Sequence, residues 1–285
     1  MGMSLDIELL RSFVVIAETR ALSRAADRVA RTQAALSQQM KRLEECVGQP
    51  LLHRTGRGVV LTQHGEQLLI HAHRILRCHD EALAELSDRG LSGTLRFGCP
   101  DDYATVFLPA LLRGFVRRHP MTQVEVDCAP TPRLRERLAQ HALDLALVSW
   151  PEGDRPEAVI RREPLVWVGH PTMTALDLDV LPLALSHPDT LDHLSATQAL
   201  RRIGRPFRIA YASSSLAGLT ALVRSGQAIA VMTQTAVPDD LQILQTGASL
   251  PPLPSVGIAL EFDHEPPSLL VEAFAQHVQV SLPDL

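Results

Sequence analysis

The sequence predicts a protein of two parts, a small helical N-terminal part and a larger α/β C-terminal part, joined by a long helix. Three observations lead to this prediction. Residues 23–47 contain two short amphipathic helices with a tight joint between them. Residues 66–89 contain neither proline nor glycine, and apolar side chains recur there every three or four residues. From residue 94 onward β-prone runs alternate with amphipathic helices, the order that α/β folds with parallel strands produce.

Composition and charge limit the possible functions. The 285 residues are 46% hydrophobic, enough for two or three domains with sizeable cores. No apolar run is long enough to cross a membrane and the N-terminus lacks a signal-peptide core, so we expect a cytoplasmic protein without a membrane partner. The net charge of −5 is uneven, because residues 1–62 hold nine basic and six acidic side chains (+3), which leaves −8 for the rest. A basic module on an acidic body fits a DNA reader coupled to a second module.

The first elements of the chain form the expected DNA reader. A helix over residues 5–19 braces the helix pair that follows. In the second helix of the pair, Leu36, Met40 and Leu43 form a buried stripe, and Thr32 is a good N-cap. The opposite face carries glutamine, serine, lysine and arginine, which suit base edges and phosphates in the DNA major groove. An ordinary amphipathic helix pair in a helical core explains this stretch equally well.

The residues after the helix pair strengthen the DNA prediction. Two short β-prone runs, Leu51–Leu52 and Val59–Leu61, flank a glycine-rich turn and form a hairpin, or wing. Two arginines on this wing suit phosphate or minor-groove contact. The predicted DNA-contact residues are Thr32, Gln33, Ala34, Ser37, Gln38, Lys41, Arg42, Arg54, Arg57 and Thr62.

The long helix predicts self-association. Its apolar seam steps by three and four residues, as in a coiled coil, and a two-fold dimer would present two recognition helices to an inverted repeat. A helix packed on its own body is the alternative. His71 and His73 lie on different faces, so we expect no metal site there. The predicted dimerisation residues are Leu69, Ala72, Leu76, His79, Leu83 and Leu86.

Residues 23–65 resemble the DNA-binding part of a known family. The stretch SRAADRVARTQAALSQQMKRLEECVGQPLLHRTGRGVVLTQHG is similar to the winged helix-turn-helix of LysR-type transcriptional regulators. The shared features are the Ala-Ala pair, the TQ…LS…LE segment, the Gly-x-x-Leu start of the wing with its arginine, and the Leu-Thr-x-x-Gly end. Leu52 stands where phenylalanine is usual and His53 where an acidic residue is usual, but neither is a predicted base reader. RIAYASSSLAGLTALVRSGQAIAVMTQTAVP resembles the LrhA/HexA-like branch.

The resemblance implies a bacterial regulator that binds a promoter inverted repeat in double-stranded DNA as a dimer or a dimer of dimers. It also implies a small-molecule effector of unknown identity and recruitment of RNA polymerase. The C-terminal part resembles the family's effector domain, whose two subdomains are similar to periplasmic binding proteins. The expected domains are a winged helix-turn-helix (1–62), a linker helix (63–90) and an effector domain (91–285), with subdomain I at 91–163 plus 264–285 and subdomain II at 164–263.

Three loops at the carboxyl ends of predicted strands should line the effector cleft, since ligands of open α/β sheets bind there. The resemblance implies the effector-binding set Asp101, Asp102, Thr131, Ser149, Ser213, Ser214 and Ser215. The two aspartates depart from the small hydroxyl residues frequent there, and their charge disfavours an anionic effector and favours an amine or another cation. Helix capping also explains Thr131 and the serines.

No sequence motif indicates catalysis or a cofactor. Nucleophile motifs, Walker loops, dinucleotide fingerprints and metal-ligand clusters are missing from the sequence, so we expect neither an enzyme nor a metalloprotein. Cys99 and Cys128 end two strands that should be neighbours. A redox-sensing pair is one interpretation, and two structural thiols, which the sequence favours, are the other. Two other functions stay open. One is a solute-binding protein with an accessory helical domain, disfavoured by the missing signal peptide; the other is an orphan regulator whose cleft takes no ligand.

Overall fold

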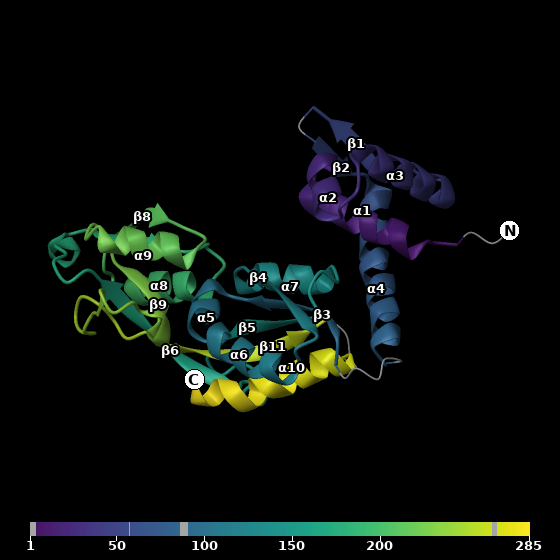
Figure 1. The fold of residues 1–285 in the computed structure, drawn as a ribbon. Helices are drawn as coiled ribbons and strands as arrows, with labels where there is room; N and C mark the ends of the chain where they lie inside the picture. Colours follow the sequence, from purple (N-terminus) through teal and green to yellow (C-terminus); the bar gives the residue numbers. More distant parts are fainter. Residues whose placement is uncertain (1–3, 57, 86–90, 264–266) are drawn as a thin grey trace. The chain divides into compact units, whose positions relative to one another are not determined.

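The computed structural model describes residues 4–56, 58–85, 91–263 and 267–285, and the chain forms two compact units (Figure 1). Unit 1 contains the chain up to Gly93 together with Gln140–Ala142, and unit 2 contains the remainder. The N-terminal helical part and the C-terminal α/β part predicted from the sequence are both present.

Unit 1 is a bundle of helices that carries a small β-hairpin. Helix α1 packs against α2, α3 and α4, and its buried Leu10, Phe13 and Ile16 meet Leu36 and Leu43 of α3 in one core. The hairpin strands are antiparallel, so the predicted wing is present. The elements are α1 (Ile7–Thr19), α2 (Leu22–Arg28), α3 (Gln33–Val47), β1 (Leu52–Thr55), β2 (Gly58–Leu61) and α4 (Gln63–Glu85).

The seam of α4 corrects part of the dimer prediction. Ala72 and Leu76 are buried in the core of unit 1, where α4 packs against α1, so this half of the seam has a partner within its own chain. Leu83 lies farther along the helix and is 58% exposed. Leu86 lies outside the described residues. The apolar seam of α4 is therefore buried in its first half and exposed at Leu83, because α1 covers only part of the length of α4.

The described part of unit 2 is built on a mixed seven-stranded sheet in the order β10-β6-β11-β5-β3-β4, with β9 paired to β6. Strands β3 and β5 are parallel, as predicted, but β11 enters between β5 and β6 and is antiparallel to both. A separate parallel pair is formed by β7 and β8. The strands are β3 (Gly93–Cys99), β4 (Thr122–Cys128), β5 (Leu145–Pro151), β6 (Arg161–Gly169), β7 (Leu181–Leu185), β8 (Phe207–Ala212), β9 (Ala230–Thr233), β10 (Gln242–Ile243) and β11 (Ser255–Phe262).

Helices cover these strands and enclose several hydrophobic clusters, of which two are the largest and are called the first and second cores below. In the first, the Phe274 ring of α10 packs edge-to-face on Phe97 and Phe115, with centroids 5.1 and 4.9 Å away. The second surrounds Trp167, whose indole N–H donates to the carbonyl of Pro251 at 2.8 Å. The helices are α5 (Asp101–Val106), α6 (Leu108–Arg118), α7 (Thr131–Ala139), α8 (Leu191–Arg202), α9 (Leu216–Arg224) and α10 (Leu269–Ser281), and the short 3-10 turns are η1 (Ala175–Asp177), η2 (Gln234–Ala236) and η3 (Leu282–Asp284).

Strand β11 connects the two cores of unit 2. Its Ile258 is buried in the first core and its Val256 in the second. The subdomain boundaries expected from the sequence stay a proposal. We call the parts of unit 2 built around the first and the second core its two halves, and β11 belongs to both.

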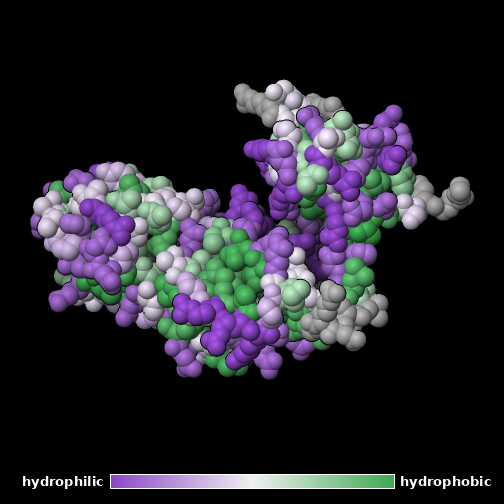
Figure 2. Space-filling view, in the orientation of Figure 1, coloured by the Kyte–Doolittle hydropathy of each residue, from purple (hydrophilic) through white to green (hydrophobic). Residues whose placement is uncertain are grey.

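The surface of unit 2 includes apolar side chains. Figure 2 shows a hydrophobic patch on unit 2 in the region of β4. The exposed apolar side chains of α6, β4 and the turn between them are Val116, Met121 and Val126. Among the described helices, none combines the length and the apolar character needed to cross a bilayer.

Candidate functional sites

The polar side chains that the sequence predicts to contact DNA lie on the outer face of α3, where they are accessible. Thr32 caps the helix, because its hydroxyl oxygen accepts a hydrogen bond from the Ala35 amide at 3.2 Å. Leu36, Met40 and Leu43 are buried on the opposite side, as the predicted stripe requires. The exposed predicted residues on or beside α3 are Thr32, Gln33, Ala34, Gln38, Lys41 and Arg42, and Ser37 is partly exposed.

Hydrogen bonds to helix residues hold the hairpin beside the helices. A carboxylate oxygen of Glu44 in α3 accepts from the backbone amides of Leu51 and Leu52 at 2.8 and 3.2 Å. At the other strand, the Val59 amide donates to the Arg20 carbonyl at 2.9 Å. The predicted wing contacts Arg57 and the Arg54 side chain lie outside the described residues.

Thr62 has a different place from the other predicted DNA contacts. Its side chain is buried, donates to the Pro50 carbonyl at 2.7 Å and accepts from the Gly65 amide at 2.9 Å. These bonds make Thr62 the cap of α4 and anchor the end of the wing. We therefore correct the prediction and remove this side chain from the proposed DNA interface.

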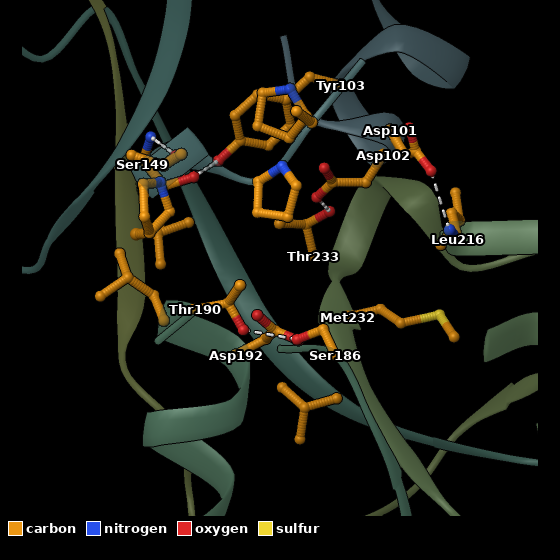
Figure 3. Close-up of a pocket in the computed structure, with 18 of the residues that line it drawn as sticks. Asp101, Asp102, Tyr103, Ser149, Ser186, Thr190, Asp192, Leu216, Met232 and Thr233 are labelled. Carbon is orange, nitrogen blue, oxygen red and sulfur yellow. Dashed lines mark hydrogen bonds between the residues drawn. The ribbon is translucent and has the colours of Figure 1, made fainter. Parts of the chain in front are cut away.

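Unit 2 contains a cavity of about 230 Å³ between its two halves (Figure 3). This volume is below the roughly 300–1,000 Å³ typical of pockets for drug-sized ligands, so the cavity suits a small molecule. Six of the seven predicted effector residues line it, namely Asp101, Asp102, Thr131, Ser149, Ser214 and Ser215. Ser213 is the exception, because its hydroxyl bonds to the Ser215 backbone within the turn before α9.

Two hydrogen bonds cross the cavity from the start of α5. The backbone amide of Leu216, the first residue of α9, donates to the Asp101 carboxylate at 3.2 Å. The hydroxyl of Thr233, at the end of β9, donates to the Asp102 carboxylate at 2.9 Å. Figure 3 shows both contacts. Adjacent carboxylates on one half of unit 2 thus hold two different elements of the other half.

The predicted hydroxyl residues have mixed roles in the cavity wall. The Thr131 oxygen accepts from the Ser149 amide at 2.9 Å, and the Ser149 hydroxyl lies 2.7 Å from that of Tyr103. The Ser215 oxygen accepts from the Gly218 amide and caps α9, so the capping interpretation is correct for this serine. These bonds fix the wall and leave few free hydroxyl groups for a ligand.

Sequence reasoning missed several polar residues of the wall. Ser186 and Thr233 follow or end strands β7 and β9, so the rule that ligands bind at strand ends could have found both. The Ser186 hydroxyl donates to the Asp192 carboxylate and lies 2.5 Å from that of Thr190. Arg135 of α7 also lines the cavity, and no local pattern marks it.

Burial changes the acid–base behaviour of Asp102. Loss of hydration raises the pKa of its carboxyl group from 3.8 to about 6, the Thr233 hydrogen bond lowers it, and the negative charge of Asp192 raises it. The main effect is desolvation, so the cavity holds a carboxylate whose charge is poorly compensated.

The two cysteines that end β3 and β4 are poor candidates for redox sensing. Burial raises the pKa of the Cys99 thiol, and Cys128 raises it further; burial and then Asp101 raise the pKa of Cys128. Little thiolate is present at neutral pH, and the thiolate is the reactive form. Among the described residues, no group of three or more histidine, cysteine or acidic side chains is arranged to hold a metal ion.

Comparison with known proteins identifies the family. Residues 7–66 match the family described as bacterial regulatory helix-turn-helix protein, lysR family, and residues 88–282 match the LysR substrate binding domain. The chain belongs to the LysR family of transcriptional regulators. Unit 1 therefore carries the DNA-binding helix-turn-helix of a LysR-type regulator, and unit 2 carries its effector-binding domain.

Individual relatives agree with this assignment. The regulator is 65% identical over 285 residues to the HTH-type transcriptional regulator DgdR of Burkholderia cepacia, covering 100% of this chain and 97% of DgdR. It is 34% identical over 253 residues to PecT of Dickeya dadantii (strain 3937), covering 88% and 80% of the two chains. The LrhA/HexA-like branch predicted for the regulator is not confirmed by these relatives.

Solved structures of LysR-type regulators share the fold. A full-length OxyR variant from Pseudomonas aeruginosa matches with a TM-score of 0.66 at 20% identity, covering 99% of this chain and 98% of that one. CbnR, solved in complex with its target DNA, matches with a TM-score of 0.63 at 23% identity, covering 97% and 100%. At these identities the likeness establishes the fold of the regulator.

Proposed function

We propose that this LysR-type regulator binds an inverted repeat in promoter DNA through the exposed face of α3. The observation that carries the proposal is the capped start of α3, which leaves Gln33, Gln38 and Arg42 accessible while the opposite stripe is buried. Glutamine suits adenine edges, and arginine suits guanine or phosphate. The wing arginines Arg54 and Arg57 would add backbone or minor-groove contacts. CbnR, which is described as bound to its target DNA, supports this role.

Self-association follows from the need to present two recognition helices to an inverted repeat. The exposed Leu83 on the second half of α4 supports a contact between copies there, and His79 precedes it on the seam as a partly buried residue. Leu69 packs against the core of unit 1 and belongs to the first half of the seam. The exposed apolar patch of β4 and α6 offers a further contact, which suits a dimer of dimers. We also expect a cytoplasmic protein that recruits RNA polymerase and has no enzymatic activity.

A small molecule in the cavity of unit 2 would control DNA binding. The proposal rests on the two hydrogen bonds that cross the cavity, from Thr233 to Asp102 and from Leu216 to Asp101. A ligand that competes with either bond binds more tightly to the arrangement of unit 2 in which that bond is broken than to the arrangement in which it is formed. Such a difference in affinity is the requirement for coupling to DNA binding. Loss of a bond on one side changes how the halves of unit 2 are held together.

An orphan regulator without an effector is the second candidate. Against it stands the open volume of about 230 Å³, since a blocked cleft would be filled by side chains. A metabolite library screened for a rise in melting temperature separates the two, because a ligand specific to the folded state stabilises it. A solute-binding protein is not favoured, since the chain carries the family's helix-turn-helix.

The decisive experiment is salt-dependent binding of the full-length protein to the DNA immediately upstream of its own gene. We expect selective binding over random DNA, with an affinity that falls as salt rises because cations are released from the phosphates. A separate selection of bound fragments from genomic DNA finds operators that lie elsewhere. Absence of any selective sequence in both experiments would contradict the proposed function.

A further inference from the structure

Two groups that could bind an anionic ligand in the cavity, the Arg135 guanidinium and the Leu216 amide, are already occupied. The Arg135 guanidinium forms a two-pronged ion pair with Glu261, with N–O distances of 2.8–3.1 Å, and lies over the Trp150 ring at 4.4 Å. At the start of α9, the Leu216 amide is bonded to the Asp101 carboxylate. A helix N-terminus attracts anions, and here the protein supplies its own. A ligand carboxylate would have to displace one of these internal anions.

Two carboxylates of the wall, Asp102 and Asp192, have no cationic side chain among their contacts in the described residues, although each lies in the first turn of a helix. Among the contacts of the described residues, Asp102 accepts from the neutral hydroxyl of Thr233, and Asp192 accepts from the neutral hydroxyl of Ser186. Figure 3 shows them on two sides of the same cavity, and each repels the charge of the other. A carboxylate removed from water without a cationic partner is costly, and a bound cation removes that cost.

The remaining wall is apolar and sets the other half of the ligand. Leu165, Leu191 and Leu219 line the cavity, together with Val231, Met232 and Val256. A metal ion or a fully hydrated cation gains nothing from such side chains, whereas an alkyl or ring group does. The volume of about 230 Å³ limits that group to a small one.

We infer that the effector of this regulator is a small organic ammonium compound, whose charged nitrogen binds between Asp102 and Asp192 and whose hydrocarbon part lies against the apolar wall. This inference rests on the proposed role of the cavity as the effector site. Asp102 and Asp192 determine the sign of the ligand charge, and the internal pairs of Asp101 and Arg135 disfavour carboxylates.

A matched set of probes tests the inference with the full-length protein. Cyclohexylammonium, cyclohexanol and cyclohexanecarboxylate share one ring and differ in charge. Both tryptophans of the chain, Trp150 and Trp167, lie in unit 2, so tryptophan fluorescence during heating reports the melting of this unit alone. We expect the ammonium compound to raise the melting temperature most, the alcohol less and the carboxylate least.

Three variants show whether the cavity is responsible. Asp102→Asn and Asp192→Asn should each weaken cyclohexylammonium binding about tenfold or more and leave the alcohol unchanged, since truncating one partner of a desolvated charge pair lowers affinity strongly. Asp240→Asn is the control, because it removes a carboxylate from the exposed Arg224–Asp240 pair outside the cavity. The inference is wrong if the carboxylate probe stabilises as much as the ammonium, or if Asp240→Asn has the same effect as the other two variants.

Operator binding distinguishes failure of the inference from failure of the proposed function. If the ammonium probe binds at Asp102 but leaves operator affinity unchanged, the ligand class is upheld and the regulatory role of the cavity is not. If the carboxylate probe binds and changes operator affinity, the regulatory role is upheld and the ligand class is overturned.

Discussion

The backbone amide of Leu216 donates a hydrogen bond to the Asp101 carboxylate at 3.2 Å, although 115 positions separate the two residues. Asp101 stands at the start of α5 and Leu216 at the start of α9, so a carboxylate in the first turn of one helix binds the first amide of another. A negative charge is stabilised at both ends. The contact joins the two halves of the effector-binding domain and fills the place where an anion would otherwise bind.

Asp101→Ala should open this place to anions. The variant loses a charge-assisted hydrogen bond, which we expect to lower the free energy of unfolding of unit 2 by about 1–2 kcal/mol. The freed amide of Leu216 should then bind acetate, so acetate stabilises the variant more than chloride does at equal ionic strength. Urea unfolding followed by tryptophan fluorescence measures both effects. Asp101→Asn keeps an acceptor oxygen and should show no acetate effect; an acetate effect of equal size in the wild type would refute the prediction.

The raised pKa of Asp102 predicts a pH dependence of stability. The carboxyl group has a pKa of about 6 in the folded chain and 3.8 as its ordinary value, so between these limits the folded state binds more protons than the unfolded state. Stability should therefore fall as pH rises from about 4 to about 6 and stay lower above that range. Near neutral pH the buried charge lowers the free energy of unfolding by on the order of 2 kcal/mol, a figure that allows for the partial exposure of the group to the cavity.

Asp102→Asn should remove this penalty. Asparagine keeps an oxygen for the Thr233 hydroxyl but carries no charge, so unit 2 of the variant should be more stable than the wild type near pH 7, and the loss of stability between pH 4 and 6 should shrink. Urea titrations at several pH values, read by tryptophan fluorescence, test this. Asp240→Asn should follow the wild-type profile in that range. A variant less stable than the wild type near pH 7 contradicts the assigned cause.

Local patterns explain why much of the fold was predictable. The stripe of Leu36, Met40 and Leu43 is buried in the structure because its period alone determines which face of α3 is apolar. The partner of a stripe is not a local property, and for that reason Ala72 and Leu76 proved to face α1 of the same chain. A dimer seam and an intramolecular seam have the same sequence period.

The cavity shows the same limit. Asp101 and Asp102 were predictable because they directly follow a strand, and Ser186 and Thr233 satisfy the same rule. Arg135 and Glu261 are 126 positions apart in the sequence. That Glu261 neutralises the charge of Arg135 can therefore be recognised only from the structure, in which this pair joins α7 to β11. The sequence predicts charged groups near the cleft, and the structure adds which of them are already compensated.

Gly65→Ala should destabilise unit 1. A methyl group at this position of α4 would lie 2.2 Å from the backbone carbonyl oxygen of Leu51, whose amide is held by Glu44. The backbone has to move, at a cost of up to about 3 kcal/mol, against a gain of about 1 kcal/mol from replacing a helical glycine. Hydrogen exchange of the α4 amides should accelerate, while tryptophan fluorescence of unit 2 stays unchanged. Gly56→Ala is the matched control, since nothing lies within 4 Å of its added methyl group; equal effects of the two variants would rule out the packing explanation.

Leu83→Asp should weaken self-association. The side chain is 58% exposed on the second half of α4, and in a two-fold dimer each substitution acts twice. Losing two buried leucines of about 1.5 kcal/mol each raises the dimer dissociation constant roughly a hundredfold. Sedimentation velocity at a series of protein concentrations measures this constant. Ala82→Asp places the same charge on the neighbouring exposed position and should change it little. If both substitutions dissociate the dimer alike, charge repulsion along the helix is the cause and Leu83 is not a contact.

Gln33→Ala should lower sequence discrimination, because Gln33 is the first residue of α3 and its side chain is exposed beside the Thr32 cap. A lost bidentate contact to a base removes about 1–3 kcal/mol of discrimination between operator and random DNA. Lys41→Ala is the comparison, since Lys41 is exposed on the same helix beside Glu45 at 3.7 Å and suits a phosphate. It should weaken operator and random DNA alike and reduce the salt slope by about one. Titrations of both DNAs at several salt concentrations separate the two effects. If Gln33→Ala lowers affinity for both DNAs equally, the first turn of α3 contacts the DNA backbone, and the helix reads bases farther along, at Ser37 or Gln38.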